Sequence, residues 1–303
     1  MTPRARSRAV EIVRAGPLTT VQDLGRPGYA HLGVGRSGAL DQPAHRLANR
    51  LVGNPPAAAT LETTLGGTAL RALGEPVVVA VCGAVAAVRV NGASVAWAAP
   101  VYVPTGALLE IGPAVRGVRS YVAIAGGFLA EQILGSRSTD LLSGLGPAPL
   151  RDGDVLAVAQ PPQVPPAADV IPVSAPADSP IELAVLPGPR AEHFGAETWH
   201  TLTRAEYRVK DQSNRIALRL DGPALARQGP DSIPSEGAIL GALQVPADGL
   251  PILFLADHPP TGGYPVIGVI PGEALHLATQ AAPSTRVRFR AANLGSPKAA
   301  RLR

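Results

Sequence analysis

Lysine, cysteine and aromatic residues are scarce in this sequence of 303 residues. The only lysines are Lys210 and Lys298, so arginine supplies nearly all of the positive charge behind the formal net charge of +4. Four phenylalanines and two tryptophans are too few for a surface that stacks nucleic-acid bases. The arginines are scattered or lie in the tails, which is typical of solvated charge. We therefore expect no nucleic-acid partner.

Disulfides and membrane spans are not expected either. Cys82 is the only cysteine, so no internal disulfide can form, which is typical of a reducing compartment. The longest apolar run, Val77 to Val88, is too short to span a bilayer. The basic start, Met1 to Arg8, is not followed by the long apolar core of a signal peptide. We expect a cytoplasmic protein with no membrane association.

Several motifs that would carry chemistry of their own are absent from the sequence. There is no Gly-x-x-x-x-Gly-Lys-[Ser/Thr] loop for ATP and no Gly-x-Ser-x-Gly nucleophile elbow. The histidines and the cysteine lack the spacing of a metal site, so we expect no bound metal. Neither lysine lies in the Ala-Met-Lys-Met setting of a biotin attachment site, so no cofactor is expected to be bound covalently. ATP or carboxybiotin, if used, would have to come with another chain.

Glycine (33) and proline (32) are abundant, and only 17% of the residues are charged. That composition favours short strands joined by turns over long helices. The pair Asn91-Gly92, between two alternating runs, predicts a β-hairpin. One clear helix is predicted after Asp41, a good N-cap, with Pro43 in its first turn and Gly53 at its end.

A segment dense in proline, 161–180, is typical of a semi-rigid linker. A strand followed by Gly-Pro begins each half of the chain, at Gly16-Pro17 and at Gly188-Pro189. This pattern indicates two related β domains, although chance similarity between strands rich in glycine and proline would produce it too. We expect one domain at 1–160 and a second at 181–303.

The most distinctive stretches are TTVQDLGRPGY, SGALDQPAHRLANRLVGN, LGSRSTD, SEGAILGALQVPADGLPI and TGGYPVIGVI. In this order, they resemble the family of KipA and the 5-oxoprolinase C subunit, which is also called allophanate hydrolase subunit 2. Members are also fused into urea carboxylases as part of the carboxyltransferase region. The resemblance implies a mainly β fold with two tandem cyclophilin-like β-barrel domains and a few short helices.

The resemblance also implies an enzyme component that is inactive alone. The implied activity is ATP-dependent hydrolysis of 5-oxoproline, with ATP and Mg used at the level of the assembled complex. The implied partners are a KipI-like chain, which is the 5-oxoprolinase B subunit, and a LamB/YcsF-like chain. Two alternatives stay open, namely a carboxyltransferase of a biotin-dependent urea or amide carboxylase, and a non-catalytic regulator that binds KipI. Departures from the family pattern, such as Pro259-Pro260 before Thr261, put the substrate in doubt more than the fold.

Hydrolysis of a phosphorylated amide needs cations for the developing negative charge and a carboxylate that orients water. The candidates for the first role are Arg26, Arg137 and Arg215, and those for the second are Asp41, Glu62 and Asp257. The candidates for substrate binding are Asn49, Arg137, Ser138, Thr139, Ser235, Gln244, Thr261, Gly262, Gly263 and Tyr264. No spacing argument places these residues in one pocket.

Most of these candidates have a plain structural alternative. Asp41, His45 and Asn49 share one face of the predicted helix, which either lines a site or is simply the solvated outer face. The Ser138-Thr139 stretch either binds a phosphate or carboxylate beside Arg137, or ties its own loop together. Gly262 and Gly263 either let a ligand approach the backbone or form a turn with positive φ.

Overall fold

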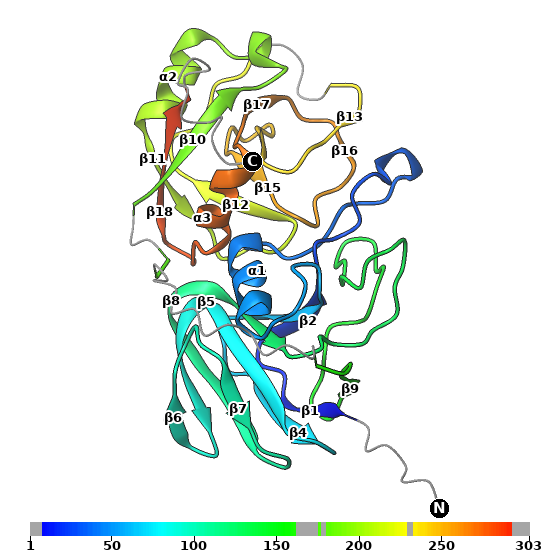
Figure 1. The fold of residues 1–303 in the computed structure, drawn as a ribbon. Helices are drawn as coiled ribbons and strands as arrows, with labels where there is room; N and C mark the ends of the chain where they lie inside the picture. Colours follow the sequence, from blue (N-terminus) through cyan, green and yellow to red (C-terminus); the bar gives the residue numbers. More distant parts are fainter. Residues whose placement is uncertain (1–7, 162–174, 177–179, 229–232, 293–303) are drawn as a thin grey trace, which may run out of the picture. The chain divides into compact units, whose positions relative to one another are not determined.

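The computed structural model describes residues 8–161, 175–176, 180–228 and 233–292. The chain divides into two compact units, Met1–Ala177 (unit 1) and Asp178–Arg303 (unit 2), drawn in Figure 1. The division falls in the proline-rich segment, most of which lies outside the described residues.

Unit 1 is built on one nine-stranded sheet with the strand order β2-β3-β8-β4-β1-β9, and β5 pairs with β6, β7 and β8. The strands are β1 (Ala9–Arg14), β2 (Leu18–Gln22), β3 (Thr60–Thr64), β4 (Ala69–Leu73), β5 (Val77–Val90), β6 (Ala93–Val95), β7 (Val101–Val103), β8 (Leu108–Ile124) and β9 (Val155–Ala157). The long strands β5 and β8 run antiparallel with register shifts at bulges, and such bulges bend a sheet. Together the strands form a half-barrel.

The predicted hairpin at Asn91-Gly92 is confirmed. Val90 pairs with Ala93 across the turn between β5 and β6. Both turn residues have positive φ, 49° for Asn91 and 82° for Gly92. That is the geometry of a type I′ turn, whose twist matches the twist of the strands.

A single helix of ten residues, α1 (Gln42–Leu51), covers one face of this sheet (Figure 1). The Asp41 side chain accepts a hydrogen bond from the Ala44 backbone N–H, which caps the helix as the sequence predicts. Ala48 and Leu51 pack in one cluster with Cys82 and Tyr121 of the sheet. The opposite face of the sheet carries a larger apolar core of valine, leucine and isoleucine side chains. Unit 1 also has a short 3-10 helix, η1 (Ala30–Leu32).

Unit 2 is a closed barrel with the strand order β10-β17-β14-β15-β12-β11-β18. Its strands are β10 (Ile181–Pro187), β11 (Glu206–Val209), β12 (Ala217–Asp221), β14 (Ala242–Gln244), β15 (Ile252–Phe254), β17 (Val266–Val269) and β18 (Arg286–Ala291). A separate ribbon pairs β13 (Glu236–Gly237) with β16 (Thr261–Gly262). The helices are η2 (Ala191–His193), α2 (Ala196–Arg204), η3 (Gly272–Ala274) and α3 (Leu275–Thr279).

Strand β18 closes the barrel by pairing with both β10 and β11, and its side chains alternate between inside and outside. Val287 and Phe289 point into the barrel and are fully buried, while the arginines that alternate with them point outward. The outward arginines meet carboxylates, as Arg288 does with Glu206 at 3.0 Å. The expectation of a mainly β chain is therefore confirmed, with a closed barrel in unit 2 and a half-barrel in unit 1.

Two further findings concern the described part of the chain. None of its helices has both the length and the apolarity needed to cross a membrane. The same residues contain no group of three or more histidine, cysteine or acidic side chains placed to hold a metal ion.

Candidate functional site

Asp23 joins the first and third of the distinctive stretches of unit 1. Its Oδ1 atom accepts from the Ser136 hydroxyl at 2.6 Å, from the Ser138 hydroxyl at 2.7 Å and from the Gly25 backbone N–H at 2.8 Å. Its Oδ2 atom accepts from the Arg137 backbone N–H at 2.6 Å. These contacts bind the two loops to each other, so they support the loop-tying interpretation of Ser138.

Two predicted cationic residues also hold backbone in this region. Arg26 is 1% exposed and donates to the carbonyl oxygens of Ile133 and Ser138. Arg137 is half-buried and its Nε donates to the Ala130 carbonyl oxygen at 3.1 Å. Both guanidinium groups therefore have contacts that position loops.

A row of polar side chains lies on the face of the sheet that α1 covers. Cross-strand pairs place Thr20 opposite Glu62, Gln22 opposite Thr60, and Glu62 opposite Tyr121. All five residues are 2% exposed or less. We call these five residues the polar row. Burying polar groups is costly unless they are hydrogen-bonded, so each contact in the row matters for stability.

Tyr121 connects two of the predicted catalytic carboxylate residues. Its hydroxyl donates to Glu62 Oε2 at 2.7 Å and accepts from the Asp41 backbone N–H at 2.7 Å. Glu62 Oε2 also accepts from the Leu40 backbone N–H, and Glu62 Oε1 lies 3.7 Å from Arg119 Nε. Burial raises the pKa of Tyr121 well above its usual value, so the phenol stays a hydrogen-bond donor at neutral pH.

The inward face of α1 carries the two other polar residues of the helix motif. His45 Nδ1 lies 2.9 Å from the Thr60 hydroxyl and Nε2 lies 3.0 Å from the Pro56 carbonyl oxygen. Burial lowers the pKa of His45 to about 4, so the imidazole is neutral at pH 7. Asn49 donates to the Ala58 carbonyl oxygen at 2.8 Å and accepts from Asn54 at 3.0 Å.

The interpretation of this helix face as a solvated outer face is therefore wrong. Asp41 is 6% exposed, and His45 and Asn49 are fully buried. The capping part of that interpretation holds, because Asp41 caps the helix. The burial of this face could not be predicted, because the helical spacing of three polar residues does not show which side of the helix packs on the sheet.

Three segments of unit 1 meet at the backbone carbonyl of Thr139. Gln22 Nε2 donates to the Thr139 carbonyl oxygen at 3.0 Å and the Ser37 hydroxyl donates to it at 2.8 Å. Two buried atoms beside this carbonyl, Gln22 Oε1 and the Thr139 hydroxyl oxygen, have no hydrogen-bond partner in the described part of the chain. An unmet buried polar atom costs about 1–3 kcal/mol, so such a pair points to a missing ligand or water.

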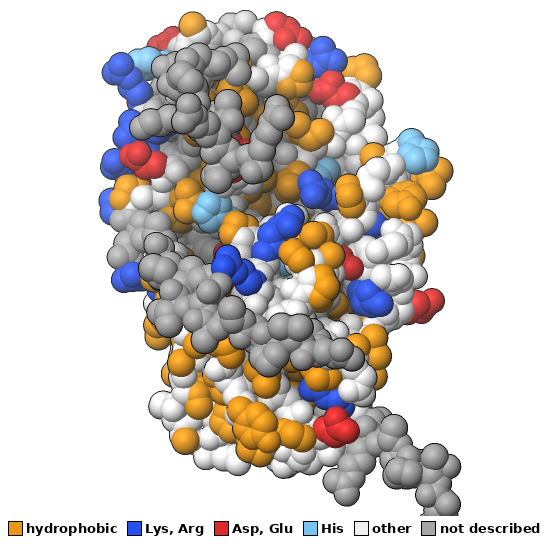
Figure 2. All heavy atoms as spheres, viewed as in Figure 1, with side chains coloured by type: hydrophobic (Ala, Val, Ile, Leu, Met, Phe, Trp, Pro, Cys, Tyr) orange, Lys and Arg blue, Asp and Glu red, His pale blue; other side chains and the backbone are white. Residues whose placement is uncertain are grey.

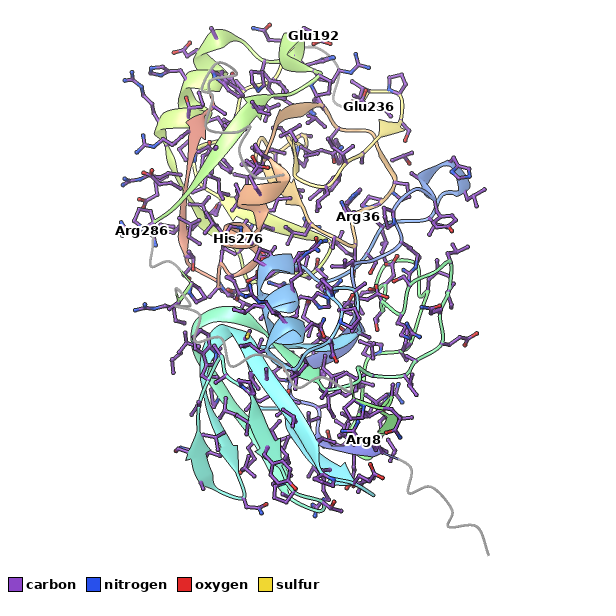
Figure 3. The ribbon with its side chains drawn as sticks, viewed as in Figure 1. Arg8, Arg36, Glu192, Glu236, His276 and Arg286 are labelled. Carbon is purple, nitrogen blue, oxygen red and sulfur yellow. The ribbon has the colours of Figure 1, made fainter. Side chains whose placement is uncertain are left out.

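Arg36 directly precedes Ser37 in the chain, which puts a cationic residue in one of the segments that meet at Thr139 (labelled in Figure 3). Its side chain is half-buried and its Nε has no partner among the described residues. Burial lowers the pKa of Arg36, so an anion beside it would stabilise the charged form. We call Gln22, Ser37 and Thr139, together with Arg36 as the sequence neighbour of Ser37, the Thr139 site. Sequence reasoning named Thr139 alone, although Gln22 stands in one of the distinctive stretches.

In unit 2, the predicted catalytic pair Arg215 and Asp257 forms a bidentate ion pair. Nε and one terminal nitrogen of Arg215 lie 2.9 Å from the two carboxylate oxygens of Asp257, and both residues are 1% exposed. The Asp257 backbone N–H also donates to the Arg215 carbonyl oxygen. The pair joins the loop before β12 to the loop after β15, and the two charges are satisfied by each other.

Gln244 and Gly262 lie in contact within unit 2. Gln244 Nε2 donates to the Tyr264 carbonyl oxygen at 3.1 Å, and a Cβ atom built on Gly262 would lie 2.5 Å from that same nitrogen. Neither Gly262 nor Gly263 is among the described residues with positive φ. The interpretation as a turn with positive φ is therefore wrong, and Gly262 is needed for close approach.

The remaining candidates of unit 2 are on or near its surface. Tyr264 is 41% exposed, and Thr261 and Ser235 are exposed. Glu236, which follows Ser235 and is labelled in Figure 3, accepts from Arg190 Nε at 2.9 Å. The predicted site residues thus separate into a buried polar group in unit 1 and a second set in unit 2.

Comparison with known proteins decides the family. The model described as the carboxyltransferase domain, subdomain A and B, matches residues 32–291. The chain belongs to this family.

Relatives of this carboxyltransferase-family chain come from two kinds of protein. It is 36% identical over 275 residues to the 5-oxoprolinase C subunit of Escherichia coli (strain K12), covering 89% of this chain and 87% of the relative. It is 32% identical over 309 residues to the urea amidolyase of Lachancea kluyveri, covering 93% of this chain but 17% of that protein. The crystal structure of the urea amidolyase of Kluyveromyces lactis matches with a TM-score of 0.90 at 29% identity, covering 97% of this chain and 19% of that one. The chain therefore spans most of the bacterial relative and a small part of the urea amidolyases.

Proposed function

We propose that this chain is a subunit of an ATP-dependent 5-oxoprolinase-type complex that hydrolyses 5-oxoproline. It would act with a KipI-like chain and a LamB/YcsF-like chain, and ATP with Mg would be used in the assembled complex. The similarity to the 5-oxoprolinase C subunit over nearly the full length of both chains supports the proposal. The absence of a P-loop in the sequence agrees with ATP being used for the reaction only in the assembled complex.

The observation that carries the choice of substrate is the Thr139 site. A lactam offers one N–H donor and one carbonyl acceptor, which match Gln22 Oε1 and the Thr139 hydroxyl, the two buried atoms that lack a partner among the described residues. 5-Oxoproline also has a carboxylate, and Arg36 is a half-buried guanidinium whose Nε lacks a partner in the same part of the chain. The proposal assigns the lactam to Gln22 and Thr139, and the carboxylate to Arg36.

Within this proposal the predicted catalytic residues take different roles. Glu62 is the one carboxylate of the polar row, and it pairs across the strands with Thr20, whose hydroxyl accepts from Gln22 of the Thr139 site. We assign to it the orientation of water. Arg26 and Asp41 act as positioning residues because their contacts hold a loop and a helix start. Arg215 and Asp257 position the loops of unit 2.

The test reconstitutes the complex from this chain and the KipI-like and LamB/YcsF-like proteins of the same genome. ATP-dependent release of glutamate from 5-oxoproline should need all three chains. The variant Arg36→Gln should raise the KM for 5-oxoproline by about tenfold or more, since a charge-assisted contact is lost. The matched control is Arg89→Gln, which changes an exposed arginine of β5 and should leave KM unchanged.

A second substrate tests the assignment of the carboxylate to Arg36 separately from the assignment of the lactam to Gln22 and Thr139. 2-Pyrrolidinone has the same lactam without the carboxylate, so any turnover of it should not respond to Arg36→Gln. An unchanged KM for 5-oxoproline in that variant would remove Arg36 from the site. A stable three-chain complex that releases no glutamate would reject the oxoprolinase function itself.

The second candidate function is the carboxyltransferase reaction of a biotin-dependent urea or amide carboxylase. It is favoured by the family description and by the similarity to urea amidolyases. Urea itself is neutral, so in this candidate the anionic partner of Arg36 is the carboxylate group that is transferred to urea. ATP- and bicarbonate-dependent carboxylation of urea, with a biotin carboxylase and a biotinylated carrier added, would favour this function.

A further inference from the structure

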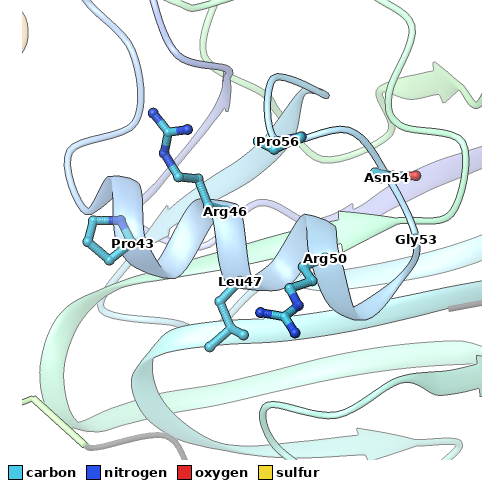
Figure 4. A pocket seen from close by; sticks show the side chains of 7 residues that line it. All are labelled: Pro43, Arg46, Leu47, Arg50, Gly53, Asn54 and Pro56. Atoms are coloured by element: carbon cyan, nitrogen blue, oxygen red, sulfur yellow. The ribbon is translucent and has the colours of Figure 1, made fainter. Parts of the chain in front are cut away.

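We propose that a groove along the outer face of α1 binds a small organic anion, with a phosphate or carboxylate group attached to an apolar or ring-shaped body. The groove has a volume of about 760 Å³ and is lined by Pro43, Arg46, Leu47, Arg50, Gly53, Asn54 and Pro56 (Figure 4). This volume lies within the usual range of small-molecule sites, roughly 300–1,000 Å³. We call it the α1 groove.

The charge of the α1 groove has one sign. Arg46 and Arg50 are exposed and lie one helical turn apart, so both belong to the same face of α1. No acidic side chain of the described residues lines the groove. In the space-filling view, basic side chains lie beside hydrophobic ones over α1 (Figure 2).

Arg46 differs from two surface arginines of unit 2, Arg190 and Arg290. Its hydrogen bond is a 3.4 Å contact with the neutral side-chain amide of Gln42. Arg190 and Arg290, in contrast, each lie 2.8 Å from a glutamate oxygen. A guanidinium in a concave site that meets an amide rather than a carboxylate is suited to bind the carboxylate or phosphate of a ligand.

The rest of the lining gives the groove a firm apolar wall. Pro43, Leu47 and Pro56 supply apolar surface, and Figure 4 shows Leu47 projecting from the same stretch of helix as the two arginines. Asn54 is fixed, since it donates to the Ile124 carbonyl oxygen at 2.8 Å and accepts from the Gly126 backbone N–H at 2.8 Å. An anion with an apolar body would use both the cations and this wall.

The α1 groove is separate from the polar row. His45 and Asn49 face the sheet and are fully buried, whereas Arg46 and Arg50 are exposed on the other side of the helix. The inference therefore goes beyond the proposed function and does not depend on it.

The test measures equilibrium binding of ATP to the purified full chain at low ionic strength, with ATP as a probe that joins an anion to a ring system. The double variant Arg46→Ala/Arg50→Ala should weaken binding about tenfold or more, since each charge-assisted contact contributes strongly. The control Arg89→Ala removes an exposed arginine of β5 and should leave affinity unchanged. Melting curves of all variants should coincide, because both groove arginines are exposed.

Two further probes define the ligand class. Pyrophosphate tests the anion alone and adenosine tests the ring system alone, and each should bind more weakly than ATP. The proposal is overturned if ATP does not bind the chain at low salt, if the double variant binds ATP as tightly as the unmodified chain, or if adenosine binds as tightly as ATP. Glutamate release by the complex is scored separately, so the failure of either proposal leaves the other standing.

Discussion

The Tyr121 hydroxyl lies 2.7 Å from Glu62 Oε2 and donates to it, beneath the helix that Asp41 begins. Glu62 and Tyr121 are directly opposite each other on β3 and β8, and both are 2% exposed or less. This contact links the sheet to the start of α1, because the same hydroxyl accepts from the Asp41 backbone N–H. The Tyr121 hydroxyl therefore satisfies two buried groups, the Glu62 carboxylate and the Asp41 backbone N–H, with one hydrogen bond each.

Tyr121→Phe should therefore lower the free energy of unfolding by about 1–3 kcal/mol, because buried partners lose their hydrogen bonds while the ring is kept. Chemical denaturation followed by circular dichroism measures the change. Tyr102→Phe is the matched control, since Tyr102 is 62% exposed and its substitution should have little effect. Equal effects of the two substitutions would show that the Tyr121 hydroxyl does not support the fold.

In unit 2, breaking the ion pair of Arg215 and Asp257 should lower the free energy of unfolding more than Tyr121→Phe does. Asp257→Ala leaves a guanidinium buried without its bidentate partner, which should cost about 3–5 kcal/mol in the free energy of unfolding. Replacing both residues, as Arg215→Met/Asp257→Leu, removes both charges and should recover much of that loss. A double-mutant cycle by denaturant unfolding measures the coupling. Additive effects would contradict a paired role.

Local patterns predicted local structure well. The helix after Asp41 and the hairpin at Asn91-Gly92 follow from capping and turn chemistry, which act over a few residues. The polar row could not be predicted in this way, because Glu62 and Tyr121 are brought together by the register of two strands 59 residues apart in sequence. Both loop stretches that Asp23 joins were recognised, but their contact with each other, across 115 residues for Ser138, has no local signal.

The partial burial of Arg36 could not be predicted for the same physical reason. A single arginine in a glycine-rich loop looks solvated in the sequence, and its partial burial depends on how the loop folds. The role of Gly262 was also open, because a glycine needed for space and one needed for positive φ look alike in a sequence. The position of the Gln244 side chain separated the two explanations.

Gly262→Ala should therefore destabilise unit 2 through crowding rather than through backbone strain. The new Cβ would lie 2.5 Å from Gln244 Nε2, so the end of the Gln244 side chain must shift, which weakens its hydrogen bond to the Tyr264 carbonyl oxygen. We expect a loss of about 1 kcal/mol. Gly237→Ala on the partner strand is the matched control, because nothing described lies within 4 Å of its Cβ. Thermal unfolding should show partial rescue when Gln244→Ala is added to Gly262→Ala, and no rescue would place the cause elsewhere.

His45 should make the stability of unit 1 depend on pH. Its pKa is lowered from 6.5 to about 4 in the folded chain because the imidazole is buried. Between these two values the unfolded state binds more protons than the folded state, so the free energy of unfolding rises with pH. The full stability is present above about pH 6.5 and is lost as the pH falls towards 4, by roughly 3 kcal/mol in total. Denaturant unfolding between pH 5 and 7, where few carboxylates titrate, measures the slope. His45→Gln removes the titrating group and should flatten it, whereas an equal slope in both chains would assign the pH dependence to other residues.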